Sequence, residues 1–297
     1  MSAQLGANQY GKAESRLVRV IRDTDRHEIR DLNVTTTLRG DFAAAHLTGD
    51  QSGVLPTDTQ KNTVYAFAKE KGVSSIEEFG RALAEHFVRS VETVQWARVS
   101  IEEYGWERIL TEDGPHDHSF VRQGQEVRTT SVTAELRDRE LAVSVVSGLK
   151  DLTILKSTGS EFRGFHVDKY TTLAETDDRI LATSLVARWR YADLDVDFDD
   201  CYARARRVML SRFATVHSRA LQESLYQMGI AALDEVPQLA EVRFSAPNKH
   251  HFLVDLDRFG VANDGEVFFA ADRPYGLIEA AVVREGSTGQ WPVESFC

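Results

Sequence analysis

The stretch PTDTQKNTVYAFAKEKGVSSIEEFGRALAEHFVRSVE, residues 56–92, predicts two consecutive helices and decides the fold class. In its second part, apolar side chains recur at helical spacing, forming one stripe of Ile76, Phe79, Leu83, Phe87 and Val91. Ser75 lies three residues before Glu78, which is a capping-box arrangement for the start of this helix. We therefore expect an amphipathic helix that packs one face on a core.

The first part of this stretch predicts a helix over 57–71, with apolar residues at Val64, Phe67 and Ala68. Thr57 lies three residues before Gln60, a second capping-box arrangement, and Asp58 falls in the first turn. Gly72 is a plausible stop for this helix because glycine adopts the left-handed conformation easily.

Segments rich in branched and aromatic residues flank the two helices and predict strands at 14–22, 31–38, 94–102, 127–136 and 141–147. The second half repeats the order, with strands at 152–156 and 180–191, helices at 199–215 and 217–234, and strands at 240–246, 251–257, 266–270 and 277–283. Clustered helices favour an antiparallel α+β fold over a doubly wound sheet. We expect two domains, 8–147 and 148–290, each ordered ββααββ.

Composition excludes several classes of protein. The chain has 297 residues, 42% of them hydrophobic, and a net charge of −11, which argues against a nucleic-acid binder. It has no apolar run long enough for a membrane span and no signal-peptide pattern at the start. Its two cysteines, Cys201 and Cys297, lie too far apart for a disulfide framework and form no CxxC pair. We therefore expect a cytoplasmic protein without membrane contact.

Motifs of common cofactor and metal sites are absent or incomplete. The sequence has no GxGxxG and no phosphate-binding loop. In DLDVDFDD, residues 193–200, Phe198 stands where a calcium loop needs glycine, so we expect a solvated strand face that runs into a helix start. His116-Asp117-His118 offers two imidazoles but no evident third ligand, which favours a surface loop.

Other polar residues have two interpretations each when they are taken singly. Lys12 is either an ordinary solvated lysine or a proton acceptor in a site. The segment from Asn248 to His251 is either a turn between two strands or the place of a general acid-base, since imidazole titrates near neutrality at His250. Taken singly, Arg179 is an ordinary surface arginine at the start of a strand, and Leu221 and Gln222 are ordinary core or surface residues of a helix.

Seven strings taken together resemble the urate oxidase (uricase) family. They are NQYGKAE (8–14), PTDTQKNTVYAFAK (56–69), LKSTGSEFRGF (155–165), DKYTTLAETDDRILATSLVARW (168–189), LQESLYQMG (221–229), PNKHHFLVDL (247–256) and DRPYGLIEA (272–280). They occur in family order over nearly the whole chain, and the cysteine-ended tail resembles bacterial members. Around 104–123 the chain departs from the family in what resembles a variable loop.

The resemblance implies a fold and an assembly. Members of the family have two tandem tunnelling-fold (T-fold) domains, each ββααββ with an antiparallel sheet. Four chains form a homotetrameric barrel with active sites at subunit interfaces. The implied reaction is the cofactor-independent oxidation of urate by O2 and water to 5-hydroxyisourate and H2O2, in purine catabolism. It needs no metal.

The resemblance also implies a role for each site residue. Phe162 stacks on the purine and Arg179 holds one edge of it, while Gln222 binds the pyrimidine edge and Leu221 makes a backbone contact. The neighbouring subunit contributes Thr57 and Asp58. The implied proton relay is Lys12, Thr57 and His250, and Asn248 holds dioxygen or water together with Thr57.

Two alternatives remain open from the residues alone. The first is a metal-dependent relative of the same fold group, such as a cyclohydrolase that acts on a purine or pterin; this would need a Cys/His zinc site. The second is a purine-binding protein without catalysis, which would fail to consume urate.

Overall fold

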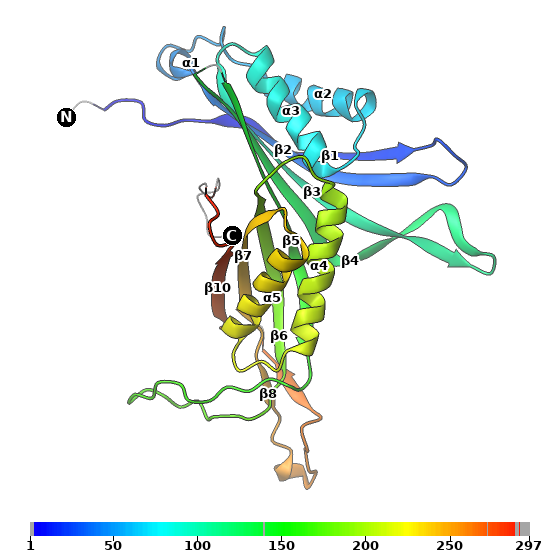
Figure 1. Ribbon diagram of the computed structural model, residues 1–297, viewed down its shortest axis with the longest axis vertical. Helices are drawn as coiled ribbons and strands as arrows, with labels where there is room; N and C mark the ends of the chain where they lie inside the picture. Colours follow the sequence, from blue (N-terminus) through cyan, green and yellow to red (C-terminus); the bar gives the residue numbers. More distant parts are fainter. Residues whose placement is uncertain (1–2, 139, 272, 289–290, 292–297) are drawn as a thin grey trace. The chain divides into compact units, whose positions relative to one another are not determined.

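The computed structural model describes residues 3–138, 140–271, 273–288 and 291 (Figure 1). The chain divides into two compact units, Met1–Gly148 and Leu149–Cys297, which we call the first and second units. The domain limits 8–147 and 148–290 stay a prediction, and residues 289–290 of the second limit lie outside the described residues. Cys297 lies outside them as well.

The first unit is built on antiparallel strands: β1 (Tyr10–Ile21), β2 (Glu28–Gly40), β3 (Val94–Thr111) and β4 (Gly114–Arg137). They pair in the order β1-β2-β3-β4. The register places Val34 opposite Ile101 and Ile101 opposite Thr130, so the buried residues share one face of the sheet. The boundary between the two units falls within β5 (Glu140–Lys156).

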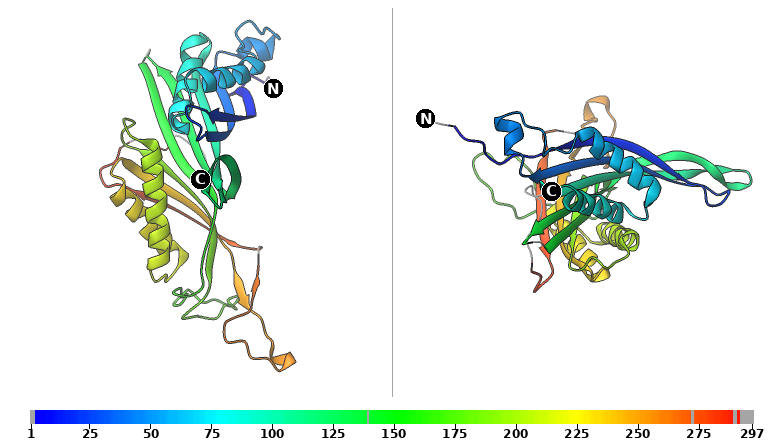
Figure 2. Two further views of the ribbon diagram at one scale, coloured as in Figure 1. Left: turned by 90° about the vertical axis from the view of Figure 1, so that its right-hand side faces the viewer. Right: turned by 90° about the horizontal axis from the view of Figure 1, so that it is seen from above.

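Helices α2 (Thr57–Glu70) and α3 (Ile76–Ser90) cover one face of this sheet, and the short α1 (Ala43–Leu47) precedes them (Figure 2). The predicted stripe of α3 is confirmed at its buried members Ile76, Phe79, Leu83 and Phe87. The helix lies close to the sheet at Gly80, where a Cβ atom would come within 2.9 Å of Val132. The Ser75 hydroxyl accepts the N–H of Glu78 at 3.1 Å, as the capping pattern predicts.

The predicted capping box at the start of α2 is wrong. Pro56 is the N-cap and makes no side-chain cap, and the helix begins at Thr57. The Gln60 side chain instead binds across to the sheet, where its Oε1 accepts the Thr36 hydroxyl at 2.7 Å. This buried tertiary hydrogen bond takes Gln60 away from the cap and leaves the Thr57 side chain without a capping role. The predicted stop at Gly72 is confirmed by its φ of 83°.

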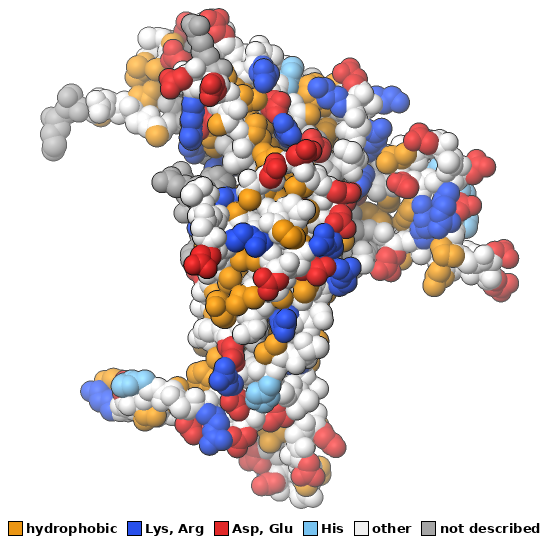
Figure 3. All heavy atoms as spheres, in the orientation of Figure 1, with side chains coloured by type: hydrophobic (Ala, Val, Ile, Leu, Met, Phe, Trp, Pro, Cys, Tyr) orange, Lys and Arg blue, Asp and Glu red, His pale blue; other side chains and the backbone are white. Residues whose placement is uncertain are grey.

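The predicted loop at 104–123 is a long hairpin instead. Strands β3 and β4 continue through it, with Trp106 opposite Arg122 and Arg108 opposite Phe120. Figure 3 shows that acidic and basic side chains both gather on this arm. The pairing here depends on backbone hydrogen bonds and on cation–π contacts such as Arg122 over Tyr104, at 4.2 Å from the ring centroid. His116 and His118 lie in β4, not in a loop.

The second unit repeats the plan, with β6 (Leu181–Tyr191), β7 (Leu239–Asn248) and β10 (Gly276–Val283) paired antiparallel in that order. Helices α4 (Phe198–Thr215) and α5 (Leu221–Glu235) pack on each other, and α5 packs on β7 and β10. Its core is filled by large buried side chains, among them Trp189, Met209, Leu225 and Phe244. The expected α+β class with antiparallel strands is confirmed in both units.

The start of α5 and two predicted strands of the second unit differ from the structure. Helix α5 begins at Leu221, because the backbone of Ser218 is hydrogen-bonded to Gly159 and Glu161 instead of continuing the helix. The predicted strands 251–257 and 266–270 shorten to β8 (His251–Leu253) and β9 (Phe268–Ala270), which pair with each other in a two-stranded sheet. The 3-10 helix η1 (Asp257–Phe259) lies between them.

The segment 193–200 forms no strand before its helix. Asp197 caps α4 instead, accepting the N–H of Asp200 at 3.0 Å. Phe198, the first residue of the helix, is buried. Within the described residues, no helix is long and apolar enough to cross a membrane. Cys201 is buried.

Candidate functional site

Phe162 and Arg179 lie together on two facing segments of the second unit. The backbone of Phe162 exchanges hydrogen bonds with Thr176 at 2.9 and 3.1 Å, and the Arg179 N–H donates to the carbonyl of Ser160 at 2.8 Å. These bonds set the guanidinium carbon of Arg179 5.0 Å from the centroid of the Phe162 ring. The pair combines an aromatic ring with a fixed cation, the two kinds of group that suit a flat anionic ligand. Phe165 stacks on the same ring, with centroids 5.0 Å apart and planes 15° from parallel.

The guanidinium of Arg179 keeps unused hydrogen-bonding capacity. Burial lowers the pKa of this half-buried group, although arginine remains charged at neutral pH. Its Nε is buried and has no hydrogen-bond partner among the described residues. A buried donor without a partner costs free energy, so a ligand acceptor at this position would be stabilising.

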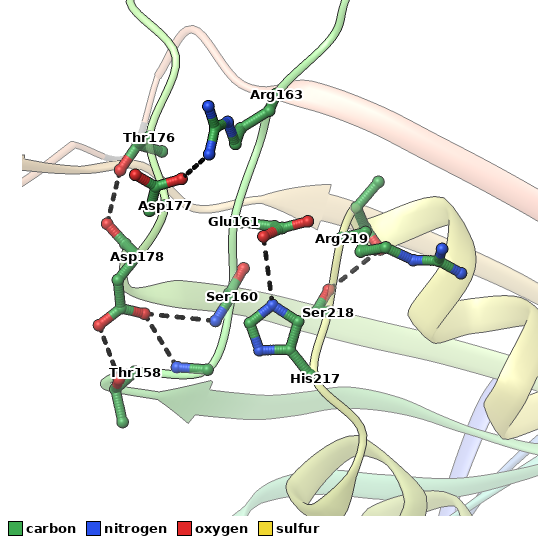
Figure 4. Close-up of polar contacts among 12 residues, drawn as sticks. Thr158, Ser160, Glu161, Arg163, Thr176, Asp177, Asp178, His217, Ser218 and Arg219 are labelled. Atoms are coloured by element: carbon green, nitrogen blue, oxygen red, sulfur yellow. Dashed lines mark hydrogen bonds and ion pairs between the residues drawn. The ribbon is translucent and has the colours of Figure 1, made fainter.

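The N-terminus of α5 is tied to the same segment (Figure 4). The Ser218 N–H donates to the carbonyl of Gly159 at 2.9 Å, and the Glu161 N–H donates to the carbonyl of Ser218 at 2.8 Å. The Ser224 hydroxyl, inside α5, donates to the Ser218 hydroxyl at 2.7 Å. The first two residues of α5 are Leu221, which is buried, and Gln222, which is exposed. The structure therefore joins the Phe162 segment and this helix start in one hydrogen-bonded block.

Asn248 and His250 lie where β7 ends. Asn248 is opposite Thr183 and Gly276 in the sheet, and the N–H of the next residue donates to the carbonyl of Ala182 at 2.8 Å. Burial lowers the pKa of His250, and the positive charges of Arg179 and His251 lower it further. The charge of Arg179 therefore acts on His250 within the second unit. The lowered pKa favours the neutral imidazole, which can accept a proton.

Lys12 lies near the start of β1 in the first unit. Its backbone N–H donates to the hydroxyl of Thr36 at 3.3 Å, the same hydroxyl that binds Gln60 of α2. Gly11 is required beside it, because a Cβ atom would lie 1.8 Å from the carbonyl oxygen of Thr36. A register shift between Lys12 and Ser15, with Glu14 at φ 56°, interrupts the regular alternation of β1 just after Lys12.

Thr57 and Asp58 are the first two residues of α2. Asp58 is exposed, and its carboxylate accepts hydrogen bonds from Lys61 and Asn62. The Lys61 hydrogen bond and charge are the main causes that lower the pKa of Asp58, and the charge of Lys12 adds to them. Lys12 therefore lies near the positive end of α2, where unpaired backbone N–H groups favour an anion.

The predicted site residues thus fall into two groups. The first unit holds Lys12, Thr57 and Asp58; the second unit holds Phe162, Arg179, Leu221, Gln222, Asn248 and His250. That the two groups form one site stays a prediction. A hollow of about 470 Å³ between β1 and α2, lined by Leu17, Arg19 and Tyr65 among others, contains none of these residues.

The candidate metal ligands are the His, Cys, Asp and Glu side chains in the part of the chain that the structure describes. No cluster of three or more His, Cys, Asp or Glu side chains there is arranged for a metal ion. The rings of His116 and His118 lie edge to face, with centroids 4.4 Å apart.

Two residues of the hydrogen-bonded block that joins the Phe162 segment to α5 were not predicted from the sequence. Asp178 accepts hydrogen bonds from the turn at 158–160, and Ser218 joins that turn to α5. The available signal was the short STGS at 157–160, since a Ser/Thr/Gly turn commonly needs an acceptor for its free donors.

Comparison with known proteins identifies a family for the chain. The Uricase family model matches residues 8–133 and 145–279. The chain is 55% identical over 297 residues to the uricase of Arthrobacter globiformis, covering 99% of this chain and 95% of that protein. It is 40% identical over 288 residues to the uricase of Dictyostelium discoideum, covering 96% of this chain and 99% of that protein.

A solved structure gives the same result for the fold. The crystal structure of the A. globiformis uricase superposes with a TM-score of 0.92 at 53% identity, covering 98% of this chain and 99% of that one. The architecture described above, with two tandem ββααββ T-fold units, is therefore the uricase architecture. On both the sequence match and the shared fold, the chain belongs to the uricase family.

Proposed function

We propose that this protein oxidises urate with dioxygen and water to 5-hydroxyisourate and hydrogen peroxide, as a cytoplasmic enzyme of purine catabolism without a metal or organic cofactor. The observation that carries the proposal is the Phe162–Arg179 pair, with a ring centroid 5.0 Å from a guanidinium whose Nε has no hydrogen-bond partner among the described residues. Urate is flat, anionic and rich in acceptors, so it matches both parts of this pair.

Binding is shared by four residues of the second unit. Phe162 stacks on the purine face, and the planar fork of Arg179 binds one anionic edge. The exposed amide of Gln222 donates to and accepts from the pyrimidine edge. Leu221 contributes its backbone N–H, which is free because the first residues of a helix have no intrahelical partner.

Proton transfer falls to Lys12, Thr57 and His250. Lys12 takes a proton from urate through the Thr57 hydroxyl, which is available because it does not cap α2. The electron-rich anion gives two electrons to dioxygen, which takes up two protons and leaves as hydrogen peroxide. Water then adds at C5, held by Thr57 and Asn248, and His250 accepts and passes on its proton. The balance is urate, O2 and water in, and 5-hydroxyisourate and H2O2 out.

Assembly completes the site in this proposal. Four copies form a homotetramer, and Thr57 and Asp58 reach the substrate from the neighbouring subunit. The separation of the predicted residues into a first-unit group and a second-unit group is consistent with this arrangement, since neither group alone has both a purine platform and the full relay.

One assay tests the function. Chelator-treated protein is mixed with urate in air, and urate absorbance, oxygen uptake and peroxide are followed together. Equal consumption of urate and O2 with equal release of peroxide supports the proposal. Absence of turnover by the assembled protein refutes it, and activity that disappears with the chelated metal would favour the cyclohydrolase-like alternative.

A further inference from the structure

The carboxylate of Asp178 gathers three donors from the turn that precedes Phe162 (Figure 4). It accepts the hydroxyl of Thr158 at 2.6 Å, the N–H of Gly159 at 2.9 Å and the N–H of Ser160 at 3.4 Å. These hydrogen bonds, that of Thr158 first, lower the pKa of Asp178 below its usual range. The three donors are neutral, so an ionised carboxylate binds each of them more strongly than a neutral acceptor would.

The backbone on both sides of Asp178 is fixed as well. The Thr176 hydroxyl donates to the carbonyl of Asp178 at 2.6 Å, and the N–H of Arg179 donates to the carbonyl of Ser160 at 2.8 Å. Asp178 therefore bridges the two segments that carry Phe162 and Arg179. Its side chain holds one segment and its main chain precedes Arg179 on the other.

The same turn is joined to α5. Its Gly159 carbonyl accepts the N–H of Ser218, and Ser218 in turn accepts the hydroxyl of Ser224. A shift of the 158–160 turn would therefore change the position of Phe162 relative to Arg179 and to the start of α5, where Gln222 lies.

We propose that Asp178 is a positioning residue for binding of the oxo-purine substrate: it fixes the Phe162 ring against the Arg179 guanidinium without touching the substrate itself. This inference rests on the proposed function and deepens it. Misplacement of a binding group by about 1 Å can cost on the order of 100-fold in efficiency. Because Phe162 and Arg179 hold the substrate before and during the reaction, their loosening should raise KM more than it lowers kcat.

Two adjacent acids supply the test variant and its control. Asp178→Asn keeps the size of the side chain but removes its negative charge, so the N–H groups of the turn are left with a weaker, neutral acceptor. Asp177→Asn is the control, because Asp177 pairs only with the exposed Arg163 in the contacts described and its side chain is 78% exposed. The readouts are KM and kcat for urate, and the Kd for xanthine, an oxo-purine, by calorimetry.

We expect Asp178→Asn to raise KM for urate and Kd for xanthine about tenfold, which corresponds to about 1.4 kcal/mol, with kcat changed less than about twofold. Asp177→Asn should leave all three values near those of the unaltered protein. Unchanged KM and Kd in Asp178→Asn, or a fall in kcat alone, would overturn the inference.

A second variant covers the case in which Asp178→Asn does not fold. Thr158→Val removes the shortest donor to the carboxylate at nearly constant volume, and it should raise KM and Kd in the same direction by a smaller factor. If the unaltered protein does not consume urate, the proposed function fails. The xanthine measurement would still decide whether Asp178 positions the binding pair.

Discussion

Replacement of Arg128 by methionine tests a buried charge pair in the first unit. The Glu77 carboxylate, in the first turn of α3, is 0% exposed, and the Arg128 side chain, in β4, is 9% exposed. Their Oε2 and Nη2 atoms lie 2.7 Å apart, and Nη1 of Arg128 lies 3.7 Å from Glu103. The Ser147 hydroxyl donates to the other carboxylate oxygen at 2.7 Å. Arg128→Met therefore leaves a buried carboxylate without its guanidinium.

The expected loss follows from this burial. Removal of one partner from a buried ion pair costs about 3–5 kcal/mol, because the other charge stays desolvated. The N-terminus of α3 offsets up to about 1 kcal/mol by its own partial positive charge. We therefore expect the free energy of unfolding to fall by about 3 kcal/mol, which lowers Tm by roughly 6–12 °C for a domain of this size.

The assay is urea and thermal unfolding at one fixed protomer concentration, so that any contribution from subunit association stays constant. The double variant Glu77→Leu with Arg128→Met removes both charges. It should recover most of the loss, because apolar replacement of a whole buried pair is often nearly neutral. A loss below about 1 kcal/mol in Arg128→Met, or strictly additive effects in the cycle, would refute the reasoning.

The remaining predictions concern the proposed reaction. Lys12→Ala and Thr57→Ala should each lower kcat roughly 100-fold or more, as loss of general-base catalysis does, and a near-normal rate would remove the relay assignment. Arg179→Ala should mainly raise KM in steady-state assays; a fall in kcat alone would contradict its anchoring role. Because the pKa of His250 is lowered, its ring stays neutral down to a lower pH than that of an ordinary histidine. The acid limb of the pH profile of kcat/KM should therefore lie below about pH 6.5. His251→Asn removes one of the charges that lower this pKa, so that limb should move to higher pH; an unmoved limb would argue against His250 as the titrating group.

The helices and the strand order were predictable because buried positions recur at a fixed spacing along a helix or a strand, and the apolar residues of the sequence show this spacing. The stripe of α3 from Ile76 to Phe87 marks one buried face, and the Ser75 cap marks its start. The hairpin arm of β3 and β4 was not predictable in this way. Its residues are largely exposed on both faces, so no alternation appears, and contacts such as Trp106 Nε1 with Asp31 at 3.0 Å depend on partners far away in sequence.

In the candidate site too, features that depend on local sequence could be predicted, and features that depend on tertiary contacts could not. The type and order of its residues were visible as motifs, and the structure places Arg179 beside Phe162, with the charge of Arg179 acting on His250. The capping role assigned to Thr57 failed, because Gln60 binds Thr36 on a neighbouring strand, and a local pattern carries no information about that competition. The function of Asp178 depends on a turn twenty residues earlier, at Thr158, and only the folded chain brings the two together.

The two groups of predicted residues differ in what they can contribute physically. The second-unit group is held by a dense set of backbone and side-chain hydrogen bonds around Ser160 and Ser218, and it offers a platform and a cation that serve ground state and transition state alike. The first-unit group offers an exposed helix start and a lysine, which matter chiefly when a proton moves. Substitutions in the second-unit binding group should therefore act mainly on KM, and substitutions at Lys12 or Thr57 mainly on kcat. This separation has a structural reason: the hydrogen-bonded binding block lies in the second unit, whereas two members of the proposed relay, Lys12 and Thr57, lie in the first unit and only His250 lies in the second.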